Sequence, residues 1–253
     1  MENKKVAIIS DTHIGSERSR FRYIALNDTI GLFKSMDTVV LNGDTFTLLG
    51  KPSTRSAILT EANREHLQKR MDTLFIELER ILRECPNTHF HYLVGNHDGF
   101  PPAYDRLQEL AKHYKNLEPH YEQLILGDAL FTHGDLNIPP KYLSTRNAFS
   151  TDRKRNFSLP GGVPGEMEQA MYQDICQNMK QAGRLNNISS VFIGHTHMPV
   201  FGYEVEGVRF YNSGGFEGER VGCIFTGNLT DDGHLKDIVA KIIEPKMLGA
   251  PSL

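Results

Sequence analysis

Short apolar runs rich in β-branched residues recur along the chain, and each of them ends abruptly in polar residues. Runs of four or five such residues are typical of strands that are buried on both faces, because a half-exposed strand would alternate with polar positions. We therefore predict a set of buried strands, which covers residues 6–9, 38–41, 90–94, 129–132 and 191–193.

Helical periodicity separates several of these runs. Over 64–85, 103–114 and 166–182, apolar residues recur at three- and four-residue steps, which predicts amphipathic helices, and Pro86 is expected to end the first of them. In the last part of the chain, short turns such as Glu206-Gly207 separate further strand-like segments. These segments cover residues 200–205, 208–211, 221–226 and 238–243.

The order of these elements predicts the fold class. Strands alternate with helices in the first part of the chain and follow one another in the last part. This order is typical of a layered α/β sandwich with mixed sheets. No segment has the composition of a linker, so we expect a single domain over residues 1–253.

One segment, residues 136–165, fits neither pattern and is expected to be an inserted cap or lid. It is rich in Pro, Gly, Ser and Asn, and its charged side chains are mostly basic. Arg153 and Arg155 are candidates for binding a second phosphate group of a substrate. The alternative interpretation is a solvated loop that happens to be basic.

Composition excludes several classes of protein. The 253 residues are 39% hydrophobic and 23% charged, which is enough to bury a core and too apolar for a disordered chain. A net charge of -3 creates no global positive field, so a nucleic-acid partner is not expected. No apolar stretch approaches the roughly 20 residues that span a bilayer, and the N-terminus lacks the apolar segment of a signal peptide. These features predict a cytoplasmic protein.

Cysteine usage excludes two further kinds of site. Cys85, Cys176 and Cys223 are odd in number and scattered, and none belongs to a Cys-x-x-Cys pair. A disulfide framework and a thiolate zinc site are therefore not expected. We expect each cysteine to be a small buried apolar residue.

Each of the five predicted buried strands is followed by side chains that bind metals. In an α/β fold, residues just beyond the carboxyl ends of strands converge on one crevice. Carboxylates, an amide oxygen and imidazoles gathered in a small volume indicate divalent metal ions. The candidates are Asp11, His13, Asp44, Asn96, His133, His195 and His197, with His97 beside Asn96.

The spacing and number of these candidates favour two ions. Asp11 and His13 are two residues apart, as are His195 and His197, so in extended backbone each pair lies on one side of its strand. Seven ligands are too many for one tetrahedral ion and suit two ions that share a carboxylate, about 3.5–4 Å apart. Oxygen and imidazole donors without thiolate suit Mn²⁺, Fe or Zn²⁺.

The motifs in this order resemble those of the calcineurin-like metallophosphoesterase superfamily. They are D-x-H at 11–13, G-D at 43–44, G-N-H-D at 95–98, H-G at 133–134 and G-H-T-H at 194–197. The resemblance implies a four-layer α/β/β/α sandwich of two mixed β-sheets flanked by helices, with a dinuclear metal centre. It also favours Mn²⁺ among the possible metals.

The resemblance further implies a role for each candidate. His97 matches the catalytic histidine of the family, which contacts the phosphate and assists the leaving group. Asp44 would bridge the two ions. The remaining ligands would be Asp11, His13 and His197 for the first ion, and Asn96, His133 and His195 for the second.

Two features near these motifs have alternative interpretations. Asn212-Ser213-Gly214 resembles a turn that supports the metal site in many members, but it is also an ordinary turn sequence. The family's protein phosphatases carry a longer G-D-x-x-D-R-G signature with an acid that orients the catalytic histidine. This chain lacks that acid, and Asp98 either replaces it or caps the following turn.

The motifs and the inserted segment also bear on the class of substrate. Residues 131–135, the chain length and the insertion before G-H-T-H are similar to UDP-diacylglucosamine pyrophosphatases. Those enzymes usually read G-N-R-D, however, and their lid is longer and more apolar, so His97 and the 136–165 segment weaken a lipid assignment. A small phosphodiester or a nucleotide-linked pyrophosphate fits better.

These observations predict a dinuclear-metal phosphoesterase. It would hydrolyse a phosphodiester or pyrophosphate bond by attack of a metal-bridging hydroxide. One alternative is a DNA-processing nuclease of the same superfamily, which the acidic net charge disfavours. Another is a non-catalytic scaffold on the same fold, which would be expected to have lost ligands that this chain retains. No oligomeric state is predicted.

Overall fold

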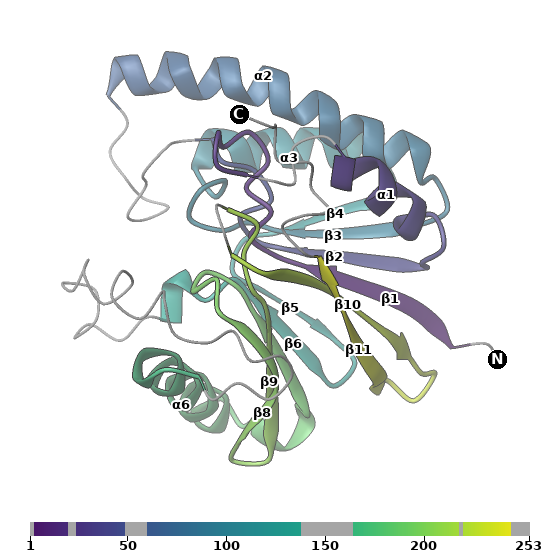
Figure 1. The fold of residues 1–253 in the computed structure, drawn as a ribbon, viewed down its shortest axis with the longest axis vertical. Coiled ribbons are helices and arrows are strands. Elements are labelled where there is room, and N and C mark those ends of the chain that lie inside the picture. Colours follow the sequence, from purple (N-terminus) through teal and green to yellow (C-terminus); the bar gives the residue numbers. More distant parts are fainter. Residues whose placement is uncertain (1–2, 20–23, 49–59, 138–163, 218–219, 244–253) are drawn as a thin grey trace.

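The computed structural model describes residues 3–19, 24–48, 60–137, 164–217 and 220–243. These residues form two β-sheets that lie between helical layers, as the sequence predicts (Figure 1). Most of the predicted cap segment at 136–165, including Arg153 and Arg155, lies outside the described residues.

The first sheet has six strands in the order β11-β10-β1-β2-β3-β4. β1 to β4 are parallel, whereas β10 and β11 are antiparallel to their neighbours. The parallel order places the carboxyl ends of β1, β2 and β3 at the same edge of the sheet. The strands are β1 (Lys4–Ile9), β2 (Thr38–Asn42), β3 (His89–Leu93), β4 (Leu117–His120), β10 (Gly222–Leu229) and β11 (Leu235–Ile243).

The second sheet has five strands in the order β5-β6-β7-β9-β8. Its inner strands β6, β7 and β9 are parallel, and the two edge strands are antiparallel, so this sheet is also mixed. The strands are β5 (Gln123–Leu126), β6 (Ala129–Thr132), β7 (Ser190–Ile193), β8 (Pro199–Val205) and β9 (Val208–Ser213).

The helices cover the outer faces of both sheets. α1 (Ile24–Phe33), α2 (Glu61–Glu84) and α3 (Pro101–His113) lie over the first sheet, and α6 (Glu166–Gln181) lies over the second (Figure 1). Two short 3₁₀ helices, Asp135–Asn137 and Leu185–Asn187, flank α6 in the chain. α2 ends just before Pro86, as predicted. In the described part of the chain, no helix combines the length and apolarity that crossing a membrane requires.

Three buried apolar clusters fill the three spaces between the four layers. Successive side chains of β3 point to opposite faces of the first sheet. Phe90 and Tyr92 therefore pack beneath the helices, whereas Leu93 packs between the two sheets. A third cluster joins α6 to the second sheet. The three cysteines are buried in these layers, as expected.

Three elements were not predicted, namely α1, β4 and β5. The sequence of β4 is Leu-Glu-Pro-His, in which only Leu117 is a buried apolar residue, so its strand character depends on pairing with β3. α1 contains Gly31, which is a poor helix former. The burial of Ile30 and Phe33 against the sheet compensates for this low propensity.

Candidate metal centre

The loops that follow β1, β2 and β7 carry the predicted ligands in an unusual backbone conformation. Of the seven non-glycine residues with positive φ in the described chain, five are predicted ligands. Left-handed conformations cost on the order of 1–3 kcal/mol each outside glycine, and such strain gathers at functional sites. The five are Asp11 (φ 54°), His13 (φ 49°), Asp44 (φ 50°), His195 (φ 67°) and His197 (φ 57°).

This conformation corrects one sequence-based expectation. The paired ligands were expected to share one side of an extended strand. Instead, Asp11 and His13 lie beyond the end of β1 with positive φ, and His195 and His197 do the same beyond β7. The pairs therefore come together through tight, strained turns, which periodicity along the sequence does not report.

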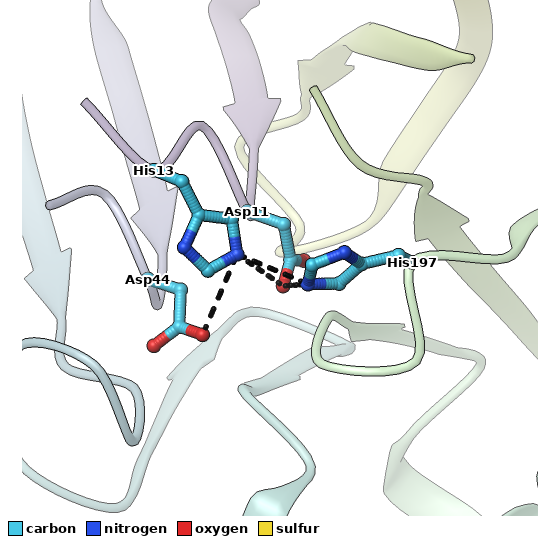
Figure 2. A group of neighbouring side chains, drawn as sticks. All are labelled: Asp11, His13, Asp44 and His197. Atoms are coloured by element: carbon cyan, nitrogen blue, oxygen red, sulfur yellow. Dashed lines mark hydrogen bonds and ion pairs between the residues drawn. The ribbon is translucent and has the colours of Figure 1, made fainter. Parts of the chain in front are cut away.

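Asp11, His13, Asp44 and His197 form a first group of potential metal ligands (Figure 2). Each offers one ligand atom, and these atoms lie within 4.8 Å of one another. His197 Nε2 is 3.1 Å from Asp11 Oδ1 and 3.0 Å from His13 Nε2. With metal–ligand bonds of about 2.0–2.2 Å, adjacent donors of one ion lie roughly 3 Å apart. The spacing therefore suits a single ion.

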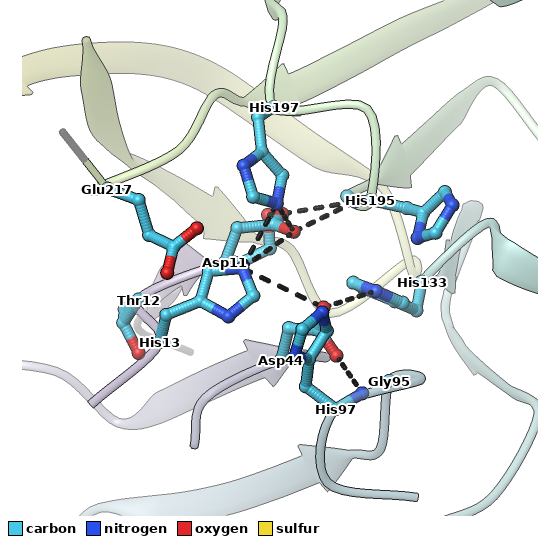
Figure 3. A network of polar contacts seen from close by, with 12 residues as sticks. Asp11, Thr12, His13, Asp44, Gly95, His97, His133, His195, His197 and Glu217 are labelled. Carbon is cyan, nitrogen blue, oxygen red and sulfur yellow. Dashed lines mark hydrogen bonds and ion pairs between the residues drawn. The ribbon is translucent and has the colours of Figure 1, made fainter. Parts of the chain in front are cut away.

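Asp44, His133 and His195 form a second group. Asn96 Oδ1 lies 2.8 Å from His195 Nδ1, so the amide oxygen adjoins this group. The two groups share Asp44, whose Oδ2 atom is 3.8 Å from His13 Nε2 and 3.2 Å from His133 Nε2. The fold thus brings all seven predicted ligands together. Figure 3 shows all of them except Asn96 with labels.

Hydrogen bonds hold the two carboxylates in place. Asp44 Oδ1 accepts a bond from the backbone N–H of His97 at 2.8 Å, which leaves Oδ2 toward the imidazoles. Asp11 accepts bonds from the backbone N–H of His195, at 3.0 Å to Oδ1 and 3.2 Å to Oδ2. The hydroxyl of Ser10 donates to Asp11 Oδ2 at 2.5 Å. Such contacts orient ligands before a metal binds.

Contacts at Nδ1 fix the orientation of two imidazoles. His13 Nδ1 lies 3.0 Å from the hydroxyl oxygen of Thr47, and His133 Nδ1 lies 3.3 Å from the carbonyl oxygen of Asn42. In both rings this leaves Nε2 toward the carboxylates. Asn42 also donates from Nδ2 to the carbonyl oxygens of Thr132 and Phe192, so it ties β2 to the second sheet beneath the site.

Glycines allow these loops to approach one another. A Cβ atom added at Gly43 would overlap the His133 ring, and one added at Gly194 would lie 2.6 Å from Asp11 Oδ2. Both positions precede a predicted ligand in the G-D and G-H-T-H motifs. The glycines of these motifs therefore serve close packing around the site.

The electrostatics of the site favour a bound cation. Asp11 and Asp44 are buried, and within the described chain their ion pairs are all with histidines. Burial raises the pKa of Asp11. Burial also acts to raise the pKa of Asp44, but the neighbouring His133 and His97 outweigh it and hold that pKa well below its usual value.

The surroundings of the histidines shift their pKa values in opposite directions. Burial lowers the pKa of His13 and of His195. Burial also acts to lower the pKa of His133, but the Asp44 carboxylate outweighs it and raises that pKa to about 10. His133 Nε2 is buried and makes no hydrogen bond in the described structure, although it lies beside Asp44. With a pKa of about 10, His133 carries a proton near pH 7 in the metal-free site. These donors fit a divalent cation, which would take the place of that proton.

Asn212 and Ser213 form the end of β9, with Gly214 next to them, and not the expected turn, but their contacts favour a supporting role. Asn212 Nδ2 donates to the carbonyl oxygen of Gly194 at 3.0 Å and to the hydroxyl of Thr196 at 3.1 Å. The hydroxyl of Ser213 accepts a bond from the backbone N–H of Ser10 at 3.0 Å. This segment therefore stabilises the loops that carry Asp11 and both histidines of G-H-T-H.

His97 lies at the site but belongs to neither ligand group. Its ring packs edge-on against His13, with ring centroids 4.8 Å apart. Its Nδ1 atom is buried, without a hydrogen-bond partner in the described structure. This placement is compatible with the catalytic role that the family resemblance implies for His97, which is to contact the phosphate and assist the leaving group.

Asp98 supports the loop and does not orient His97. Its Oδ1 atom accepts a bond from the backbone N–H of Gly95 at 2.6 Å, and its Oδ2 atom accepts bonds from the backbone N–H of Phe46 and the hydroxyl of Tyr92. Burial raises the pKa of Asp98 to about 6. The sequence left open that Asp98 orients His97 or caps the turn that follows, and its contacts in the described structure fit neither, because they hold the preceding Gly95, the loop after β2 and Tyr92.

Glu217 was not predicted to lie at the site. It accepts a hydrogen bond from the hydroxyl of Ser16 at 2.7 Å, and its charge acts on His13 (Figure 3). Thr47 and Asn42 were also missed. The only sequence signal was for Asn42, a polar residue at the end of an apolar run just before the G-D motif.

Comparisons with known proteins agree with this architecture. The structure resembles that of a dimetal phosphatase from Danio rerio, with a TM-score of 0.51 and 11% identity over 96% of this chain and 98% of that chain. This likeness concerns the fold alone. Weaker matches are Vps29 from Chaetomium thermophilum (TM-score 0.39, 10% identity, 95% of both chains) and a putative 5′-nucleotidase from Staphylococcus aureus (TM-score 0.43, 13% identity, 96% of this chain and 54% of that chain).

The family follows from the sequence match. No curated protein sequence matches the chain. The model of the calcineurin-like phosphoesterase family, however, matches residues 4–207, a range that contains both groups of potential ligands. The chain therefore belongs to the calcineurin-like phosphoesterase family.

Proposed function

We propose that this protein is a phosphoesterase that uses two divalent metal ions to hydrolyse a phosphodiester or pyrophosphate bond in a small or nucleotide-linked substrate. The observation that carries the proposal is the position of Asp44. Its Oδ2 atom faces His13 in one ligand group and His133 in the other, while the backbone N–H of His97 binds Oδ1. This position supports Asp44 as the ligand that both ions would share.

The proposed ligand sets follow the two groups. Asp11, His13, Asp44 and His197 would hold the first ion, and Asp44, Asn96, His133 and His195 would hold the second. The oxygen and nitrogen donors suit Mn²⁺, Fe or Zn²⁺, and we favour Mn²⁺ on family resemblance. When bound, the ions would activate water and stabilise charge on the phosphoryl oxygens.

His97 is the proposed general acid. It lies against His13 but outside both ligand groups, so a proton on its ring is free to move to the departing oxygen. Because Nδ1 is buried, we assign the donation to Nε2. The Asp44–His97 backbone bond sets the position of His97 relative to the bridging carboxylate.

Arg153 and Arg155 remain proposed contacts for a second phosphate group. Replacing both with alanine is expected to raise KM for a nucleoside diphosphate sugar, because a diphosphate has a group that the metals do not hold. Hydrolysis of bis(p-nitrophenyl) phosphate would be nearly unchanged. Equal effects on both substrates would indicate that these residues support the fold instead.

The proposed function is tested with a panel of substrates and a ligand variant. Purified protein with Mn²⁺ is assayed on bis(p-nitrophenyl) phosphate, p-nitrophenyl phosphate, a UDP-sugar and single-stranded DNA, before and after EDTA treatment. We expect hydrolysis of the first and third, abolished by EDTA. Asp44→Asn would lose metal and activity together while its circular dichroism stays native. Activity in metal-free protein would refute the proposal, and preferential cleavage of DNA would favour a nuclease.

A further inference from the structure

A second cluster of imidazoles lies on β3 and β4, apart from the metal centre. His89 and His91 are on β3, and Glu118 and His120 are on the edge strand β4, where His91 pairs with Glu118 in the parallel register. Alternation along the strands places His89 and His91 on one face, and Glu118 and His120 on the same face. We call these four residues the edge-strand cluster.

The donor atoms of three members of the edge-strand cluster, His89, His91 and Glu118, are spaced as metal ligands are. Glu118 Oε2 lies 3.3 Å from His89 Nε2 and 3.5 Å from His91 Nδ1. His120 Nε2 lies 3.0 Å from His91 Nδ1 and 3.7 Å from Glu118 Oε1. A tetrahedral zinc ion with bonds of about 2.0–2.1 Å holds its donors roughly 3.3–3.4 Å apart. The two distances from Glu118 Oε2 to His89 and His91 match that value, whereas His120 lies outside the group whose ligand atoms are all within 4.8 Å of one another.

We propose that the edge-strand cluster is a separate binding site for one Zn²⁺ ion. The ligands would be the imidazoles of His89 and His91 and the carboxylate of Glu118, a donor set that suits zinc with water in the fourth position, and His120 would lie beside them. The ligand atoms of His89, His91 and Glu118 all lie within 4.8 Å of one another, as do those in each of the two groups of the metal centre. Asn96 and His97 of that centre follow the end of β3, so the cluster uses none of the centre's residues.

The surroundings of the cluster agree with metal binding. The side chains of His91 and His120 are 9% and 15% exposed, whereas those of His89 and Glu118 are 41% and 54% exposed. The site therefore has a sheltered side and a side open to solvent, by which an ion can enter. Burial lowers the pKa of His120 and that of His91, the latter to about 4, so both rings are neutral near pH 7. A neutral imidazole needs to lose no proton before it binds a metal.

Zinc at this position would join β4 to β3. β4 has four residues, one of which is Pro119, which has no N–H to donate to the sheet. A bound ion would add a link between side chains of the two strands. The expected consequence is slower hydrogen exchange at the backbone amides of β4.

The test counts zinc in the full-length protein after equilibrium dialysis against Zn²⁺. The double variant His89→Asn/Glu118→Gln changes the two exposed members of the cluster, so the fold is expected to survive. We expect it to bind one Zn²⁺ fewer per chain than wild type, while Mn²⁺-dependent hydrolysis of bis(p-nitrophenyl) phosphate is unchanged. The control Glu109→Gln/His113→Gln removes one exposed carboxylate and one exposed imidazole from α3 and should match wild type.

Two results would overturn the proposal. The first is equal zinc content in wild type and the cluster variant, which would identify the cluster as a network of hydrogen bonds only. The second needs no variant: exchange at the β4 amides of wild-type protein that is unaffected by Zn²⁺. Neither measurement depends on phosphoesterase activity, so failure of the zinc site and failure of the proposed function are distinguishable.

Discussion

Gly95→Ala tests whether the packing around Asp44 controls metal binding. Gly95 opens the G-N-H-D motif after β3. A Cβ atom at this position would overlap Asp44 Oδ1 and lie 2.6 Å from the backbone nitrogen of Asp44. The backbone at Gly95 does not have a positive φ, so alanine introduces no conformational strain of its own. The expected effect is therefore purely steric.

The magnitude follows from these contacts. Cβ atoms essentially never lie closer than 3.0 Å to other heavy atoms, so the Gly95 and Asp44 backbones must separate by about 0.4 Å or more. Hydrogen bonds to Asp98 and His13 restrain both segments. Overpacking of this kind costs about 1–3 kcal/mol of stability. Displacing the contacts that orient a ligand typically weakens metal affinity by about 10–100-fold, which is the loss we expect.

The assay combines Mn²⁺ affinity by dialysis, hydrolysis of bis(p-nitrophenyl) phosphate and thermal unfolding of the metal-free protein. Gly31→Ala is the matched control, because a Cβ atom there meets nothing within 4 Å. Gly31 lies within α1, so alanine should stabilise the protein by about 0.5–1 kcal/mol and leave activity unchanged. If Gly95→Ala binds Mn²⁺ as tightly as wild type and hydrolyses bis(p-nitrophenyl) phosphate at the same rate, the packing around Asp44 does not control metal binding.

Three other predictions concern the same site. His97→Ala should retain both metals in elemental analysis while kcat falls by about 10²–10⁴-fold, as for loss of a general acid; a loss of metal would make His97 a ligand. Asn212→Ala removes the bonds to Gly194 and Thr196, and should reduce Mn²⁺ affinity by about 10–100-fold in dialysis; unchanged affinity would mean that Asn212 supports the fold and not the metal site. Because the pKa of His133 is raised to about 10 in the metal-free protein, Mn²⁺ must displace a proton below that pH, so affinity should rise between pH 7 and pH 10. Calorimetry in buffers of different ionisation enthalpy would detect that proton, and its absence would contradict the assignment of His133.

The sequence determined the strands and helices whose patterns are strong. The apolar run at 6–9 and the helical stripe at 64–85 each matched an element of the structure to within a few residues. Buried parallel strands and amphipathic helices leave such patterns because each must match one periodicity along its whole length. The order of the motifs also indicated the family, which the family model confirms.

Elements with weak patterns depended on tertiary contacts. β4 pairs with β3 although its sequence contains Pro119, and α1 forms although it contains Gly31. Pairing with β3 in one case and burial against the sheet in the other outweigh local propensity, which is a small effect per residue. The edge-strand cluster has the same origin, because the parallel register places Glu118 opposite His91.

At the metal centre, the sequence identified the residue types and the structure decided their geometry. The motifs named Asp11, His13 and Asp44, but extended spacing did not account for their positive φ angles. A left-handed conformation at a non-glycine residue is unfavourable by itself and persists only where the surrounding packing imposes it. Which carboxylate oxygen faces both groups, and the contacts of Asp98 with Gly95, Phe46 and Tyr92, were decided in the same way. These features depend on contacts between residues far apart in the chain, and no local pattern encodes them.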